Sequence, residues 1–181
     1  MGVYFAFYYV ASFSRDIIGM EYTQSLDLLL LMNGVGTVGR LVPNYLGDLL
    51  GPINVFVPVA LMAGVCQRCW MGVTNPAGLY AWACFYGIAA GGIQSIFPAS
   101  LSSLTTDLRK TGVRMGMVFT TNSFATLIGP PIAGAIISAS GGSYYGAQAF
   151  AGAVLLVGTG FLAAARIARM RRLGGGWLVK I

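Results

Sequence analysis

The sequence predicts an all-α integral membrane protein with about six transmembrane helices, of which the first is truncated. Three observations predict this class. Hydrophobic residues make up 56% of the 181 residues and charged residues only 9%, whereas a soluble domain carries roughly 25% charged residues. The apolar residues form long runs without the alternation of a membrane β-strand. An open sheet would leave backbone groups unsatisfied in lipid. A soluble enzyme, a disordered chain and a transmembrane barrel are therefore disfavoured.

Five apolar runs have the length, about 20 residues, that crosses the hydrocarbon core as a helix. A shorter run at 2–13 precedes them, and at about 1.5 Å per residue it covers only half of a bilayer. Turn-forming Gly, Pro, Asn and Ser residues separate the runs, which predicts helices joined by short loops. The predicted full spans are 28–46, 53–73, 78–101, 115–138 and 145–165.

The basic residues predict which side of the membrane each loop faces. Nine of the eleven lie in the loop 102–114, in the tail, or at the span end beside loop 47–52. By the positive-inside rule these segments are cytoplasmic, including a basic tail at 169–181 that suits an anionic inner leaflet. The net charge of +6 is therefore explained by the orientation of the chain in the membrane. We expect a multi-pass protein of the plasma membrane and no nucleic-acid partner.

Two sequence patterns that occur in enzymes have a structural interpretation in this chain. Cys66-Gln67-Arg68-Cys69 lies in an apolar run, with no second pair and no histidine in the sequence, so packing is favoured over a redox or metal site. The G-x-G-x-x-G pattern at 34–39 lies within a span and lacks the acidic residue of a dinucleotide site. Small residues that let helices approach closely explain it better. The five acidic residues form no pair within a span, so we expect no enzyme, cofactor or metal.

The span 28–46 carries a polar stripe. Asn33, Thr37, Arg40 and Asn44 recur at the spacing of one helix face. Because an arginine within a bilayer is costly, such a stripe is typical of a bundle interior or a water-filled path. In one interpretation Arg40 binds an anionic substrate group. In the other it reaches the cytoplasmic interface or pairs with Asp48.

Weaker polar patterns mark two later spans, with Gln94 in one and Asn122 in the other. The span of Asn122 continues into Gly129-Pro130-Pro131. Consecutive prolines are expected to interrupt helix hydrogen bonding and kink the helix, and broken helices commonly mark transport sites or hinges. Hydrogen bonding between helices is the competing role for these polar side chains. The spans 53–73 and 145–165 hold fewer polar residues and are predicted to be outer, lipid-facing helices.

Five segments together resemble the C-terminal six-helix half of a major facilitator superfamily transporter, specifically the fungal monocarboxylate-transporter-like family. The resemblance covers 1–168 and assigns helices seven (partial) to twelve. It rests on MNGVG (32–36), GRLVPNYLGD (39–48), AGGIQSIFP (90–98), GVRMGM (112–117) and GPPIAG (129–134).

The resemblance implies twelve helices in two halves, a central cavity and alternating access. It implies secondary transport of a small organic anion or neutral solute, monocarboxylate-like, with or without a proton. Arg40, Asn33, Thr37, Gln94 and Asn122 would then contact the solute.

A second set of residues matches structural and gating motifs of this family. Asn44 and Asp48 match a cytoplasmic loop motif, and Gly129, Pro130 and Pro131 would serve helix bending. Two positions depart from the family pattern. Leu49 replaces a basic residue of the loop motif, and Gly36 replaces an aspartate of animal monocarboxylate carriers.

The resemblance also predicts that the chain is incomplete. The N-terminal half of the family's fold is absent from the sequence, and helix seven would begin partway along at Met1. A truncated transporter would need the lipid bilayer and its missing half. The alternative is a non-transporting half-bundle that associates with a full-length relative.

Overall fold

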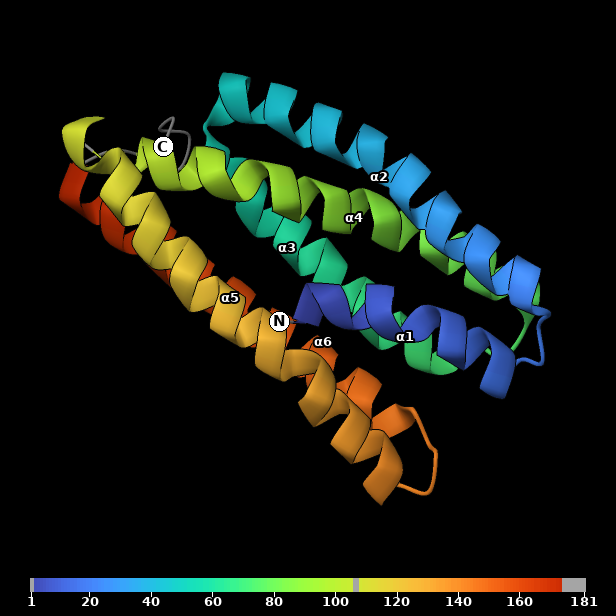
Figure 1. The fold of residues 1–181 in the computed structure, drawn as a ribbon. Coiled ribbons are helices and arrows are strands. Elements are labelled where there is room, and N and C mark those ends of the chain that lie inside the picture. Colours follow the sequence, from blue (N-terminus) through green and yellow to red (C-terminus); the bar gives the residue numbers. More distant parts are fainter. Residues whose placement is uncertain (1, 106–107, 174–181) are drawn as a thin grey trace.

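A computed structural model describes residues 2–105 and 108–173, apart from the side chains of residues 108, 172 and 173. Every regular element of this part of the chain is helical (Figure 1). The elements are α1 (Gly2–Asp16), α2 (Tyr22–Leu50), α3 (Pro52–Cys69), the 3-10 turn η1 (Trp70–Gly72), α4 (Pro76–Ser103), α5 (Leu108–Ala139) and α6 (Tyr145–Leu173).

Five of these helices are long and apolar enough to cross a membrane, namely α2 to α6, with η1 continuing α3. This confirms the predicted all-α membrane fold with five full spans. The first helix, α1, has 15 residues, close to the short first run that the sequence predicts.

The helices extend beyond the predicted spans. α2 reaches Leu50 and α5 begins at Leu108, so much of the predicted loops 47–52 and 102–114 is helical. α6 continues to Leu173 and includes the first five residues of the predicted tail. Apolarity marks only the part of a helix inside lipid, whereas the helix itself can continue into the polar interface. The rest of that tail, including Lys180, lies outside the described residues.

The turns between helices follow from local chemistry. Gly51 separates α2 from α3 with a φ of 97°, in the left-handed region that favours glycine. Pro52 then opens α3, where its missing N–H is not needed. The Asn75 side chain caps α4 by accepting a hydrogen bond of 2.6 Å from the Gly78 backbone N–H.

α2 and α4 lie side by side along most of their length (Figure 1). The contact joins backbone to backbone. A Cβ on Gly36 would lie 3.3 Å from the Gly87 carbonyl oxygen, and one on Gly39 would overlap the backbone of Ile88. A Cβ on Gly91 would overlap the backbone of Gly36. The prediction that the glycines of 34–39 serve close helix approach is confirmed for Gly36 and Gly39.

Stacked aromatic rings form part of the core beside α1. Trp70 stacks on Trp82 with ring centroids 4.5 Å apart, and Trp82 stacks on Tyr86 at 4.9 Å. The Trp82 indole N–H donates to the Cys66 carbonyl oxygen (2.7 Å), and the Tyr86 hydroxyl donates to that of Val3 (3.0 Å). These bonds satisfy the polar ends of buried rings and fasten α4 to α3 and α1.

α5 is attached differently. Among its described side chains only Gly129 and Ala133 are buried. The rest of the helix is partly or fully exposed and lies beside α6, away from α2 (Figure 1). α5 therefore buries residues only around its proline pair among its described side chains, and it meets α4 a second time where Phe119 packs against Phe97.

Candidate solute-binding cavity

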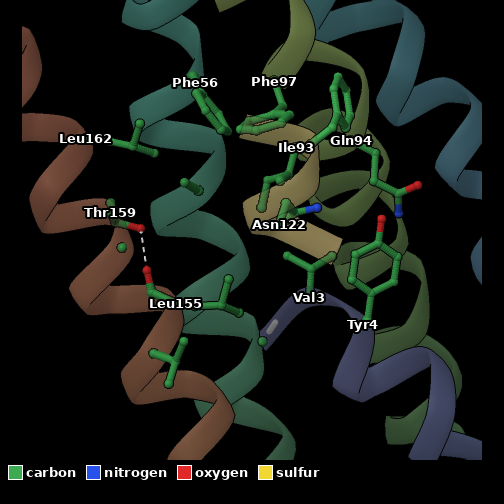
Figure 2. A pocket seen from close by; sticks show the side chains of 15 residues that line it. Val3, Tyr4, Phe56, Ile93, Gln94, Phe97, Asn122, Leu155, Thr159 and Leu162 are labelled. Carbon is green, nitrogen blue, oxygen red and sulfur yellow. Dashed lines mark hydrogen bonds between the residues drawn. The ribbon is translucent and has the colours of Figure 1, made fainter. Parts of the chain in front are cut away.

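A cavity of about 470 Å³ lies between the start of α1 and the helices α3, α4, α5 and α6 (Figure 2). Phe97 of α4 is central to its wall. The Phe97 ring packs edge-on against Phe56 of α3 (centroids 6.3 Å apart) and Phe119 of α5 (5.7 Å). Three helices thus contribute aromatic surface of the kind that buries an organic ligand.

Gln94 of α4 and Asn122 of α5 supply amide groups to this cavity, and Tyr4 of α1 supplies a hydroxyl. In Figure 2 the polar ends of these three side chains lie on the same side of the cavity. No hydrogen bond within the described part of the chain engages them. They are therefore available as donors and acceptors to a bound molecule.

Thr159 of α6 also lines the cavity, but its hydroxyl donates to the Leu155 carbonyl oxygen one turn earlier (2.8 Å). No Asp, Glu, Lys or Arg is among the lining residues of this cavity. The site therefore presents apolar surface and neutral hydrogen-bonding groups. Such a lining suits the binding of an organic molecule.

The structure separates the predicted solute-binding residues into two groups. Gln94 and Asn122 meet at the cavity, whereas Asn33, Thr37 and Arg40 lie on the exposed face of α2 and are not part of its lining. This face is open because the opposite face of α2 packs against α4.

On α2 the short polar side chains bond to their own helix. The Asn33 amide donates to the Leu29 carbonyl oxygen (2.9 Å), and the Thr37 hydroxyl donates to that of Asn33 (3.3 Å). The Arg40 carbonyl oxygen accepts from the Ser95 hydroxyl of α4 at 3.3 Å. The solute-binding roles of these residues remain predictions.

The predicted gating residues are also separate from the cavity lining. Asn44 is half-buried and Asp48 exposed near the end of α2. Gly129 is buried, Pro130 half-buried and Pro131 exposed in α5.

α5 continues as one helix through Gly129-Pro130-Pro131, so the prolines do not divide it, and the kink expected there stays a prediction. Membrane helices tolerate proline where a neighbouring helix supplies other hydrogen bonds. In the same turn the Tyr9 hydroxyl of α1 donates to the Pro130 carbonyl oxygen at 2.8 Å, which is not one of the carbonyls that the prolines leave without a helix partner.

The sequence did not single out Tyr4 or the cavity-lining phenylalanines. The interpretation of 53–73 and 145–165 as lipid-facing helices needs correction on one face of each. Phe56 of α3 and Thr159 of α6 are about 5% and 6% exposed and line the cavity. Thr159, which with Gln148 is one of the few polar residues of the span 145–165, was the available signal for α6. For the phenylalanines there was none, because lipid-facing and cavity-facing aromatic residues look alike in sequence.

At the opposite end of α1, Tyr144 ties the start of α6 to α1 through a hydrogen bond from its hydroxyl to Asp16 Oδ2 (2.8 Å). Burial, with the bond to Asp16 as a second cause, raises the pKa of Tyr144 above the ordinary tyrosine value. This link lies beyond the membrane-crossing part of α6 and closes the bundle on the side away from the predicted cytoplasmic loops.

The fold defines a multi-pass membrane protein, and the cavity between its helices is lined by aromatic rings and neutral polar groups. No family model matches the chain. It is 52% identical over 167 residues, 91% of its length, to an MFS-type transporter of Gibberella zeae. It is 32% identical over 158 residues (87%) to an aspyridones efflux protein of Emericella nidulans. It is 31% identical over 180 residues (99%) to an agnestins efflux protein of Paecilomyces divaricatus.

These similarities cover most of the chain and support its membership of the major facilitator superfamily. The chain spans 38%, 32% and 40% of the lengths of these three relatives.

Proposed function

We propose that residues 1–168 form the C-terminal half of a major facilitator secondary transporter in the plasma membrane, with the tail 169–181 in the cytoplasm. The function is the transport of a small organic solute, monocarboxylate-like or neutral. The observation that carries this proposal is a cavity lined by aromatic rings and unengaged amides, within a chain similar to MFS-type transporters over nine-tenths of its length.

In this proposal Gln94 and Asn122 bind polar groups of the solute, and the phenylalanines cover its apolar part. Arg40 binds or neutralises an anionic group outside the cavity, on a polar face that also holds Asn33 and Thr37. Two of the relatives bear the names of efflux proteins, which supports export as the direction of transport.

A second candidate is a half-bundle that associates with a longer relative without transporting by itself. Its support is the exposure of large apolar side chains on α5 (Val113, Met117, Phe119, Phe124, Leu127 and Ile128). A helix with so few buried residues leaves most of this surface for lipid or for another polypeptide.

Uptake into vesicles that contain the longest gene product including this chain tests the transport function. Lactate and benzamide, each radiolabelled, serve as an anionic and a neutral probe. We expect Gln94→Ala and Asn122→Ala to reduce the uptake of the transported probe at least about tenfold, since each loses a hydrogen bond worth about 1.5 kcal/mol. Uptake equal to that of empty vesicles for both probes would reject transport of these two solute types.

Arg40→Ala tests the anionic role separately, with Arg15→Ala at the other end of the bundle as the matched control. If Arg40 binds an anionic group, only its variant loses lactate uptake, while benzamide uptake is unchanged. Equal lactate uptake by the two arginine variants would remove Arg40 from the site. Recovery of the chain from detergent in a stable complex with a full-length relative, without uptake, would favour the half-bundle.

A further inference from the structure

The single hydroxyl of Tyr9 reaches the point where α5 is attached to the bundle. Tyr9 belongs to α1, and its hydroxyl donates to the carbonyl oxygen of Pro130, 121 residues later in the chain. Phe5 stacks on the Tyr9 ring with centroids 5.1 Å apart, and Tyr144 packs edge-on at 6.5 Å. The ring is thus held from two sides, and the hydroxyl has a fixed direction.

α5 has a glycine, Gly134, at the position where the Tyr9 hydroxyl approaches it. A Cβ on Gly134 would lie 2.9 Å from the Tyr9 hydroxyl oxygen, and no other atom outside the helix lies within 4 Å of that position. Glycine at 134 therefore leaves the space that the Tyr9 side chain uses. The two buried residues of α5, Gly129 and Ala133, lie in the same turn as Pro130.

The prolines make this turn the weakest part of α5. Pro130 and Pro131 have no N–H, so the carbonyls of Thr126 and Leu127 lose their partners in the helix. A helix without these bonds bends more easily there than elsewhere. Tyr9 bonds to this turn, and Phe119, three residues before Asn122, packs against Phe97 of α4. Since the remainder of α5 is largely exposed, the direction of α5 beside the cavity depends on these two contacts.

Asn122 lies eight residues before Pro130, at about 12 Å along the helix. A change of about 10° in the direction of α5 would move Asn122 by about 2 Å. This displacement is comparable to the difference between a hydrogen bond and no contact. Asn122 faces the cavity shared with Gln94, so the position of one amide relative to the other depends on this turn.

We propose that Tyr9 is a positioning residue, which fixes α5 at Pro130 and thereby places Asn122 against Gln94 in the cavity. The inference rests on the proposed function for its consequence in transport. The attachment itself is independent of what the protein carries. Gly134 is also part of this contact, because a residue without a side chain lets the Tyr9 hydroxyl reach the helix surface.

The distance between two spin labels tests the attachment directly. The labels replace exposed residues, Met117 on α5 and Phe85 on α4, after the three cysteines have been changed to serine. Met117 lies about 20 Å from Pro130 along the helix, so a turn of about 10° shifts it by about 3 Å. We expect Tyr9→Phe to broaden the label distance distribution or shift it by at least this amount.

Tyr8→Phe is the matched control, since Tyr8 is 59% exposed on the same helix. It removes one hydroxyl from α1 without touching α5 and is expected to keep the original distribution. If Tyr9→Phe only lowers the unfolding temperature and leaves the folded-state distances as they were, Tyr9 merely stabilises the fold and the inference is wrong.

Gly134→Ala tests the same contact from the side of α5, with Gly116→Ala as its control. Both changes place alanine in α5, but a Cβ at Gly116 meets no atom within 4 Å. We expect only Gly134→Ala to reproduce the Tyr9→Phe distances. The double variant should then equal either single variant, because both remove one contact. Additive shifts would show that the Gly134→Ala change acts independently of Tyr9 and would contradict the inference.

Uptake measurements with the same variants separate this inference from the proposed function. An altered distance with unchanged KM for a transported probe would reject the positioning of Asn122 and leave transport intact. If no variant, including the unmodified protein, transports either probe, the proposed function fails while the distance result still decides the attachment of α5.

Discussion

The α2–α4 pair and the α5 helix show two opposite ways to hold a helix in this bundle. α2 and α4 meet through glycines along a seam where an added Cβ at Gly36, Gly39, Gly87 or Gly91 would press on or overlap the backbone of the other helix. α5 buries residues only around its proline pair, meets α4 again through Phe119 and exposes most of the remainder. The α2–α4 pair is therefore more closely packed than α5.

The difference shows where polar residues in a membrane helix are free to act. On α2 the polar stripe is fixed on the open side of a rigid pair, and Asn33 and Thr37 bond to their own helix. On α5 the Asn122 amide has no partner in the described chain and is carried by the least constrained helix. A solute that binds both the polar stripe of α2 and Asn122 of α5 would therefore connect the closely packed α2–α4 pair to α5.

The glycine seam should respond most strongly to substitution. Gly39→Ala places a methyl group on the backbone of Ile88 and should lower the free energy of unfolding by about 2–3 kcal/mol, as overpacking typically does. Gly34→Ala is the control, because its Cβ meets open space. Thermal unfolding in detergent measures both, and equal effects would mean that the seam is not rigid.

Leucine truncation compares the two helices at equal chemistry. Leu28 of α2 is 0% exposed and Leu127 of α5 is 73% exposed. Leu28→Ala should cost about 2 kcal/mol, mainly through a cavity, whereas Leu127→Ala should change the free energy of unfolding by less than about 0.5 kcal/mol. If Leu127→Ala is as destabilising as Leu28→Ala, then α5 is packed against something that this single chain does not show.

Replacing a buried amide on α3 should have a smaller effect, and it should raise the free energy of unfolding instead of lowering it. Gln67 is fully buried, and both polar atoms of its amide lack a hydrogen-bond partner within the described residues. Gln67→Met should raise the free energy of unfolding by about 1 kcal/mol by removing this cost. The same change at the exposed Gln24 should bring no gain. Loss of stability on Gln67→Met would indicate that water or another partner satisfies the amide.

The link between Asp16 and Tyr144 should give the smallest effect at neutral pH. Tyr144→Phe loses one hydrogen bond and should cost about 1 kcal/mol or less. Because the pKa of Tyr144 is raised in the folded state, an unfolded tyrosine loses its proton first as the pH rises above about 10. The stabilisation is therefore complete below that pH and decreases above it.

Unfolding temperatures measured between pH 8 and 11 test this link. Tyr144→Phe should weaken the alkaline decrease, and Tyr145→Phe, at an exposed neighbour, should leave it unchanged. Identical profiles for the two variants would remove Tyr144 as its source.

The positions of the membrane spans along the sequence could be predicted from the apolar runs, because lipid requires long apolar helices and excludes most alternatives. The helix ends could not, since a helix continues beyond its apolar part. The glycine spacing at 34–39 indicated that this helix approaches a neighbour closely. It did not indicate that the neighbour is α4 or that Gly87 and Gly91 face the contact, because spacing does not say which helices meet.

The site was predictable only in part, for a related reason. Gln94 and Asn122 attract attention because amides are rare in apolar spans, and the structure places both at one cavity. The same reasoning also selects Asn33 and Arg40, which lie elsewhere. Polarity identifies a face that avoids lipid, but which faces converge depends on packing between distant segments. Tyr9 shows this limit most clearly, since its partner lies 121 residues away.

The stacked indoles of Trp70 and Trp82 also supply an optical readout. Two indoles whose centroids lie 4.5 Å apart at an angle of 24° are close enough for their electronic transitions to couple. The near-ultraviolet circular dichroism should therefore change when α4 separates from η1, even while all helices persist. Detergents and lipids can then be ranked by whether they keep this end of the bundle assembled, before any solute is known.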